Sequence, residues 1–184
     1  MEESDWSSDV CSSDLPTAMS PTPAYDQLAA ASQRLYHFGH LASITRWDQE
    51  TNMPPGGNEA RGAALAELAA LMHRLHTEPG LGQQIDRAEQ EPLDDVQRAN
   101  LREMRREWRQ STALPEALVQ ARTLAASRCE HAWRAQRRAN DWKGFLANFR
   151  DVMRLAREEG ELLSQLLGVS KYEALMDRFE PGMS

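Results

Sequence analysis

The chain has 184 residues, of which 28 are acidic and 21 are basic, giving a formal net charge of −7. Because proteins that bind nucleic acid carry a basic surface, this balance argues against a nucleic-acid partner. The sequence has no signal-peptide pattern at its start and no apolar run long enough to cross a bilayer, so we predict a soluble protein without a membrane partner.

The first 18 residues differ from the rest of the chain. They repeat a Ser-Ser-Asp unit, lack apolar periodicity, and hold five of the 28 acidic residues but none of the 21 basic ones. We interpret residues 1–18 as a non-native, adapter-like, disordered extension before a native start at Met19, which leaves a net charge of −2. The remainder keeps Cys129 alone, which excludes an intrachain disulfide there and favours a cytoplasmic protein.

Residues 19–184 are predicted to form one helical region. Ala and Leu are abundant, and apolar residues recur every three or four positions, the period of an amphipathic helix. A first helix is predicted from Pro23 to Asp48, and a second begins after Asn58 as its N-cap and stops before Pro79. With no convincing strand, the fold class is all-α, built from antiparallel helices.

Further helices are predicted in the second half of the chain. A short one covers residues 81–88, and a long one runs from Asp94 to about residue 113. The next carries small residues at steps of three and four over residues 118–132. Asp141 is expected to cap another helix that ends at Gly168, and a capping box formed by Ser170 and Glu173 begins the last.

The segment of residues 43–59 joins the first two helices and is the most informative part of the sequence. Its Pro-Pro-Gly-Gly run, residues 54–57, cannot continue a helix and permits a chain reversal. Trp47 and Asp48 precede this corner. We therefore predict a buried joint in which the Asp48 carboxylate accepts hydrogen bonds from backbone donors that the turn leaves unpaired.

Seven sequence blocks follow one another along the chain: A-Y-D-Q-L, R-L-Y-H-F-G-H-L, W-D-Q-E-T-N-M-P-P-G-G, L-D-D-V-Q-R-A-N-L-R-E-M, S-R-C-E-H-A-W, N-D-W-K-G-F-L-x-N-F and K-Y-E-A-L-M-D-R-F-E-P-G-M. Each block is weak by itself, whereas their order is specific. In this order they resemble the N-terminal part of the carboxypeptidase Taq family of zinc metallocarboxypeptidases, and the resemblance runs from about Ala24 to Ser184.

The family resemblance implies zinc held by a His-Glu-x-x-His helix and a more distant glutamate. None of the five histidines is followed by glutamate: His37, His40, His73, His76 and His131. We therefore expect a chain truncated at its C-terminus, with zinc in the full-length protein and none bound by these residues. Two histidine pairs have helical spacing, but neither has a third ligand nearby, so we predict no metal site there.

Two other features have a structural interpretation. Arginines at residues 98–109 could indicate nucleic-acid binding, but interleaved glutamates favour a solvated helix face with ion pairs. Cys129 lies near His131, but two residues apart on a helix they point in different directions, which favours a buried structural cysteine. The tryptophans are predicted to be core anchors.

By resemblance, the complete protein removes single residues from peptide C-termini, has a deep groove and forms a homodimer. Its partners would be peptide substrates and the missing C-terminal part of the same chain. Residues 19–184 would supply the N-terminal helical wall of the groove, and Trp47, Asp48 and Gln49 are predicted to shape that wall. The fragment alone is expected to be inactive. The alternative is a non-catalytic helical bundle that acts as an interaction scaffold.

Overall fold

The computed structural model describes residues 20–182, within which all regular structure is helical. The helices are α1 (Pro23–Thr51), α2 (Asn58–His76), α3 (Leu81–Ala88), α4 (Asp95–Thr112), α5 (Glu116–Arg138), α6 (Trp142–Leu167) and α7 (Lys171–Met176), with a 3-10 turn at Pro55–Gly57. The predicted all-α class is confirmed. The extension predicted at residues 1–18 lies outside the described residues.

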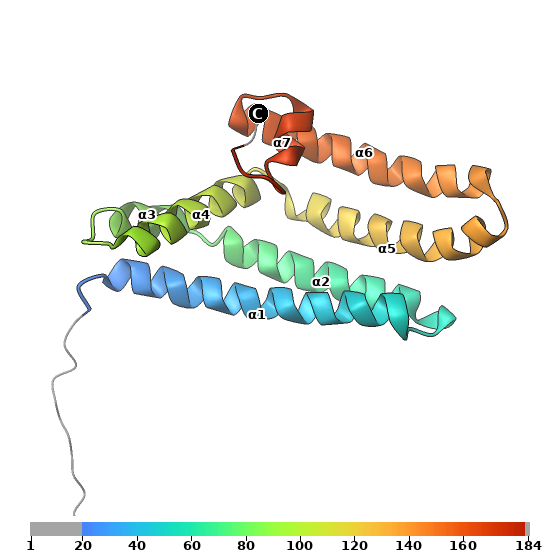
Figure 1. Ribbon diagram of the computed structural model, residues 1–184, viewed down its shortest axis with the longest axis horizontal. Helices are drawn as coiled ribbons and strands as arrows, with labels where there is room; N and C mark the ends of the chain where they lie inside the picture. Colours follow the sequence, from blue (N-terminus) through green and yellow to red (C-terminus); the bar gives the residue numbers. More distant parts are fainter. Residues whose placement is uncertain (1–19, 183–184) are drawn as a thin grey trace, which may run out of the picture.

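Four long helices lie side by side in a single layer (Figure 1). α1 packs against α2, α2 against α5, and α5 against α6, and each neighbour runs antiparallel to the one before. α3 and α4 pack near the start of α1, and α7 packs on α6. The layer therefore leaves broad faces on both sides of α2 and α5, unlike a closed four-helix bundle.

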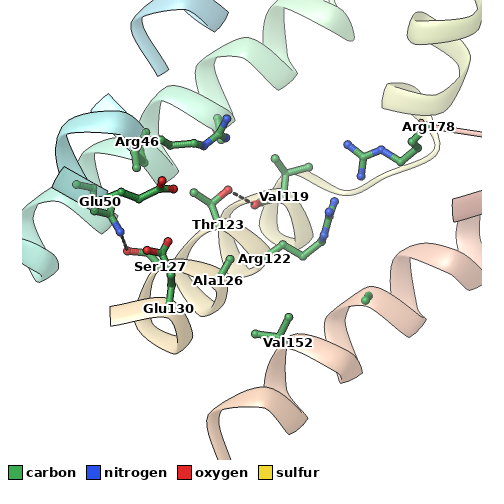
Figure 2. Close-up of a pocket in the computed structure, with 14 residues that line it drawn as sticks. Arg46, Glu50, Val119, Arg122, Thr123, Ala126, Ser127, Glu130, Val152 and Arg178 are labelled. Carbon is green, nitrogen blue, oxygen red and sulfur yellow. Dashed lines mark hydrogen bonds between the residues drawn. The ribbon is translucent and has the colours of Figure 1, made fainter. Parts of the chain in front are cut away.

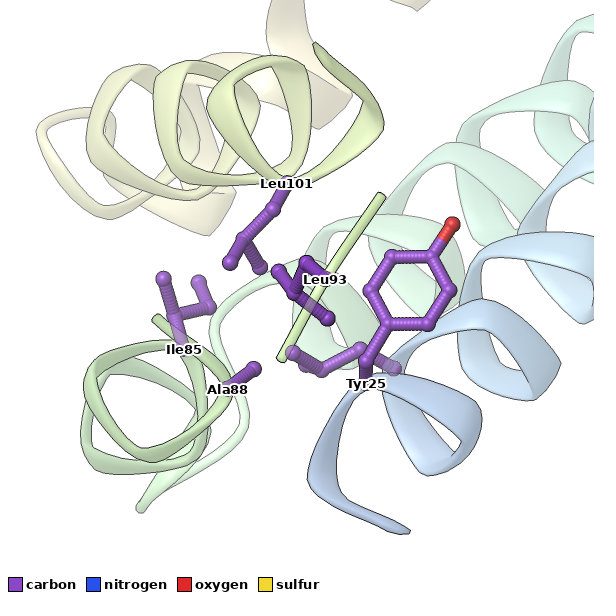
Figure 3. Close-up of a cluster of buried hydrophobic side chains, with 6 residues drawn as sticks. Tyr25, Ile85, Ala88, Leu93 and Leu101 are labelled. Atoms are coloured by element: carbon purple, nitrogen blue, oxygen red, sulfur yellow. The ribbon is translucent and has the colours of Figure 1, made fainter. Parts of the chain in front are cut away.

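The largest group of buried side chains lies where α1, α3 and α4 meet (Figure 3). Leu28 from α1, Ile85 from α3 and Leu101 from α4 are all nearly inaccessible to solvent. Tyr25 closes one side, and its hydroxyl accepts a hydrogen bond from the Asn100 side-chain amide at 3.1 Å. This cluster fixes the start of α1, while a smaller one around Leu118 and Leu155 joins α5 to α6.

Most predicted helix ends are confirmed. The Asp141 carboxylate accepts from the Gly144 backbone N–H at 2.9 Å, and Gly168 adopts the left-handed conformation, with φ of 70°. The capping box of Ser170 and Glu173 is present. The prediction that Asn58 caps α2 is wrong. Asn58 is instead its first helical residue, and its side chain faces α5.

A candidate groove wall

One face of the four-helix layer contains a cavity of about 410 Å³ (Figure 2). α1 contributes Arg46 and Gln49 to its lining, α2 contributes Leu65, and α5 contributes Thr123. Val152 of α6 lies on the far side. Because its lining comes from all four layered helices, this cavity exists only once the whole layer has assembled.

Gln49 belongs both to the signature segment and to the cavity lining. Its side chain is 4% exposed, and its amide Nε2 donates to the Ser127 hydroxyl of α5 at 3.0 Å. That hydroxyl in turn donates to Asn58 Oδ1 at 3.3 Å. The chain of hydrogen bonds joins α1, α5 and α2 just beside the corner. Gln49 Oε1 is buried and has no hydrogen-bond partner among the described residues.

Asp48 does not have the predicted contacts. Its carboxylate forms an ion pair with Arg61, one helical turn into α2, so it links the two sides of the corner. The backbone carbonyl of Asp48, rather than the carboxylate, accepts from the N–H groups of Asn52 and Met53, each at 2.9 Å. The predicted role of the carboxylate in the turn is therefore wrong, and the carboxylate instead pairs with Arg61 across the corner.

Trp47 lies on the solvent side of α1, with 62% of its surface exposed. The prediction of a buried tryptophan at this joint is wrong, because the neighbouring helix α2 covers the opposite side of α1, where Gln49 lies. Trp133 and Trp142 are also exposed, and Trp108 packs against the buried cluster of α1, α3 and α4. Of the three predicted wall residues, Gln49 alone lines the cavity of Figure 2.

A buried charge cluster at the edge of this cavity was missed from the sequence. Glu159 of α6 is 1% exposed, and one of its carboxylate oxygens accepts from both Arg122 of α5 and Arg178 after α7. Burial lowers the pKa of the Arg122 guanidinium, and Glu159 opposes that change. The sequence did contain one indication of its burial. Glu159 lies four residues after Leu155 and four before Leu163, and both leucines face inward.

None of the histidines belongs to a cluster of possible metal ligands in the described part of the chain. Residues 20–182 contain no cluster of three or more His, Cys, Asp or Glu side chains suited to a metal ion. His37 and His40 are exposed, whereas burial lowers the pKa of both His73 and His76. Cys129 is buried, and desolvation raises the pKa of its thiol, as expected for a structural cysteine.

The protein-family model described as Carboxypeptidase Taq (M32) metallopeptidase matches residues 27–184. The chain belongs to this family. Thermostable carboxypeptidase 1 of Thermus thermophilus is 33% identical over 177 residues, which cover 90% of this chain and 34% of that protein. The resemblance in sequence is therefore confirmed over the region that also forms the helical layer.

Solved structures of relatives have the same fold. Trypanosoma cruzi metallocarboxypeptidase 1 is 41% identical, with a TM-score of 0.72, over 89% of this chain and 33% of that one. The Pyrococcus furiosus carboxypeptidase, in its apo-Mg form, is 28% identical with a TM-score of 0.68 over 87% of this chain and 32% of that one. This chain thus spans about a third of the length of these relatives. Among residues 20–182, no helix is both long and apolar enough to cross a membrane.

Proposed function

We propose that this chain is the N-terminal helical portion of a zinc-dependent metallocarboxypeptidase that releases single amino acids from peptide C-termini. The observation that supports this most strongly is the family match over residues 27–184. The face of the layer that carries the 410 Å³ cavity would form one wall of the substrate groove. The complete protein would be a cytoplasmic homodimer.

The described residues do not fit a zinc site of this family. They provide no cluster of three suitable ligands, and their histidines lack the His-Glu-x-x-His spacing. We propose that zinc is held by residues outside this chain, where it would activate water for peptide hydrolysis. The role of residues 20–182 would then be to shape the groove and hold the peptide, and the chain alone would be inactive.

Within the wall, the three signature residues would have different roles. Gln49 would fix the position of α1 against α5 through Ser127, and both residues line the cavity. Asp48 would hold the corner through Arg61. The exposed indole of Trp47 would provide an apolar contact for a neighbouring part of the complete protein.

A chimeric enzyme tests this function. Residues 27–184 would replace the matching segment of the Thermus thermophilus relative, and release of C-terminal amino acids would be measured with zinc and after its removal. We expect zinc-dependent release by the chimera and none by the 184-residue chain alone. A folded chimera that binds zinc but does not release amino acids would instead support the scaffold alternative.

Variants at the corner test the wall residues in the same chimera. Because the Asp48–Arg61 pair is about one-third exposed, Asp48→Ala should lower the free energy of unfolding by about 1 kcal/mol or less and reduce peptide turnover. Arg61→Ala should have the same effect, and the double variant should cost less than the two single changes added together. Unchanged stability and turnover in Asp48→Ala would contradict the proposed role.

A further inference from the structure

Three arginines line two adjoining cavities of the helical layer. Arg46 of α1, Arg122 of α5 and Arg178 after α7 line the 410 Å³ cavity, and the same three line a second cavity of about 380 Å³. Figure 2 shows their side chains coming from three different parts of the chain, with Arg122 and Arg178 extending toward each other. We call these residues the arginine trio.

The arginine trio has hydrogen-bonding capacity that the described residues do not use. A guanidinium carries five N–H donors in a planar arrangement. Arg122 and Arg178 each donate through Nη1 to the same oxygen of Glu159, and their other nitrogens have no acceptor among residues 20–182. The side chain of Arg46 forms neither a hydrogen bond nor an ion pair within that range, and the residue is exposed. An acceptor of suitable shape could therefore bind without breaking existing contacts.

The charge around the trio is unbalanced. Glu159 is one carboxylate against three guanidinium groups, and its burial holds Arg122 and Arg178 in place. Glu50 and Glu130 line the first cavity toward Ser127, and Glu130 is already paired with Arg134. Neither of these glutamates lines the second cavity, whose lining includes Glu107 instead. The region where the two cavities adjoin is therefore positively charged.

We propose that the arginine trio binds a carboxylate group of a peptide. Guanidinium groups match the planar, two-oxygen geometry of a carboxylate, and a partly desolvated site strengthens such hydrogen bonds. The carboxylate could be the C-terminus of the peptide or an acidic side chain within it. The choice of a peptide as the ligand rests on the proposed function, whereas the anion chemistry rests on the arginines alone.

Binding of short peptides to the 184-residue chain tests this site by isothermal titration calorimetry at low ionic strength. The probes are acetyl-Ala-Ala-Ala with a free or an amidated C-terminus, and amidated acetyl-Ala-Glu-Ala and acetyl-Ala-Gln-Ala. Tighter binding of the free terminus than of its amide would identify the C-terminal carboxylate. Tighter binding of the Glu peptide than of the Gln peptide would identify the side chain. Equal binding within both pairs would overturn the proposal.

The test variant is Arg46→Gln, because Arg46 is exposed and lines both cavities, whereas Arg122 and Arg178 pair with the buried Glu159. It should weaken binding of the preferred peptide about tenfold, the value of one charge-assisted hydrogen bond. Arg150→Gln is the matched control, since it removes the same charge from an exposed position on α6. Equal effects of the two variants would refute a role for the trio. This result is independent of turnover by the chimera, so the two proposals can fail separately.

Discussion

At the scale of single residues, Glu159 is a charged side chain that is almost completely buried. Its carboxylate is 1% exposed and is neutralised by Arg122 and Arg178. Glu159→Gln would leave two arginines without their counter-ion, and we expect it to lower the free energy of unfolding by about 3 kcal/mol. Denaturant unfolding would measure this. Glu158→Gln, at the exposed neighbouring position, should change stability little, and equal losses in the two variants would contradict the assigned contacts.

Burial of histidine predicts a dependence of stability on pH. Desolvation is the main cause that lowers the pKa of His76 below its ordinary value of 6.5. Below pH 6.5 the unfolded chain therefore takes up a proton that the folded chain binds less well, so the free energy of unfolding should fall as the pH drops from 7 to 5.5. Above pH 6.5 this contribution should be constant.

The variant His76→Gln should reduce this slope, and denaturant unfolding at several pH values would measure it. His37→Gln is the control, since His37 is exposed on α1. If both variants kept the original slope, titration of His76 would not be its cause.

The burial and contacts of individual side chains were predicted from the sequence less well than the positions of the helices. Trp47 was expected to be buried because tryptophan is apolar, yet the side of α1 that packs against α2 includes Gln49 instead. Glu159 was overlooked because its counter-ions come from α5 and from the segment after α7, and Arg122 is 37 residues away. Contacts between residues so distant in sequence depend on how the helices assemble, which local patterns do not specify.

At the scale of helices, substitutions of two glycines test how closely the helices pack. A Cβ atom on Gly82 of α3 would lie 2.5 Å from a ring carbon of Trp108, whereas one on Gly39 of α1 would lie 3.9 Å from the Met72 methyl group. Gly82→Ala should therefore destabilise the chain by about 1–3 kcal/mol through overpacking.

Gly39→Ala is the matched change without a clash, and it should stabilise the chain by up to about 1 kcal/mol because alanine favours the helix. Thermal or denaturant unfolding would compare the two variants. A neutral or stabilising effect of Gly82→Ala would show that Trp108 does not pack against α3 as described.

Helix boundaries were the most predictable part of the fold. The short helix Leu81–Ala88 occurs where it was predicted, and α1 extends three residues past the predicted end at Asp48. These boundaries follow from local signals, such as the Asp141 cap and the left-handed Gly168. Asn58 was misassigned because Gly57 occupies the cap position and the Asn58 side chain bonds to Ser127.

At the scale of the whole molecule, α1 leaves apolar side chains on its outer surface. Leu41, Ile44 and Trp47 are spaced by three residues and are 53%, 50% and 62% exposed. Since exposed apolar patches favour association, we expect the 184-residue chain to self-associate at micromolar concentrations. Sedimentation velocity over a concentration series would detect this.

The variant Leu41→Lys should shift the chain toward the monomer. Val96→Lys on α4 is the control, because Val96 is also exposed, at 69%, but lies on another helix. A chain that stays monomeric at all concentrations would contradict this prediction.

The order of the helices in the layer follows from long-range contacts such as that between Gln49 and Ser127, which are 78 residues apart. The sequence predicted antiparallel helices but not that α2 lies between α1 and α5, nor that a cavity forms across them. The family resemblance supplied the expectation of a groove wall. The face that carries the 410 Å³ cavity is the one that we propose as that wall.

The most direct test of the groove wall is photo-crosslinking in the chimeric enzyme. A peptide substrate carrying a benzophenone near its C-terminus would be bound, irradiated, and its attachment sites mapped by mass spectrometry. We predict crosslinks to residues that line the 410 Å³ cavity, such as Val119, Thr123 and Ala126. Crosslinks confined to the Thermus thermophilus part, or to the opposite face of the layer around Ala63 and Leu124, would contradict the proposed wall.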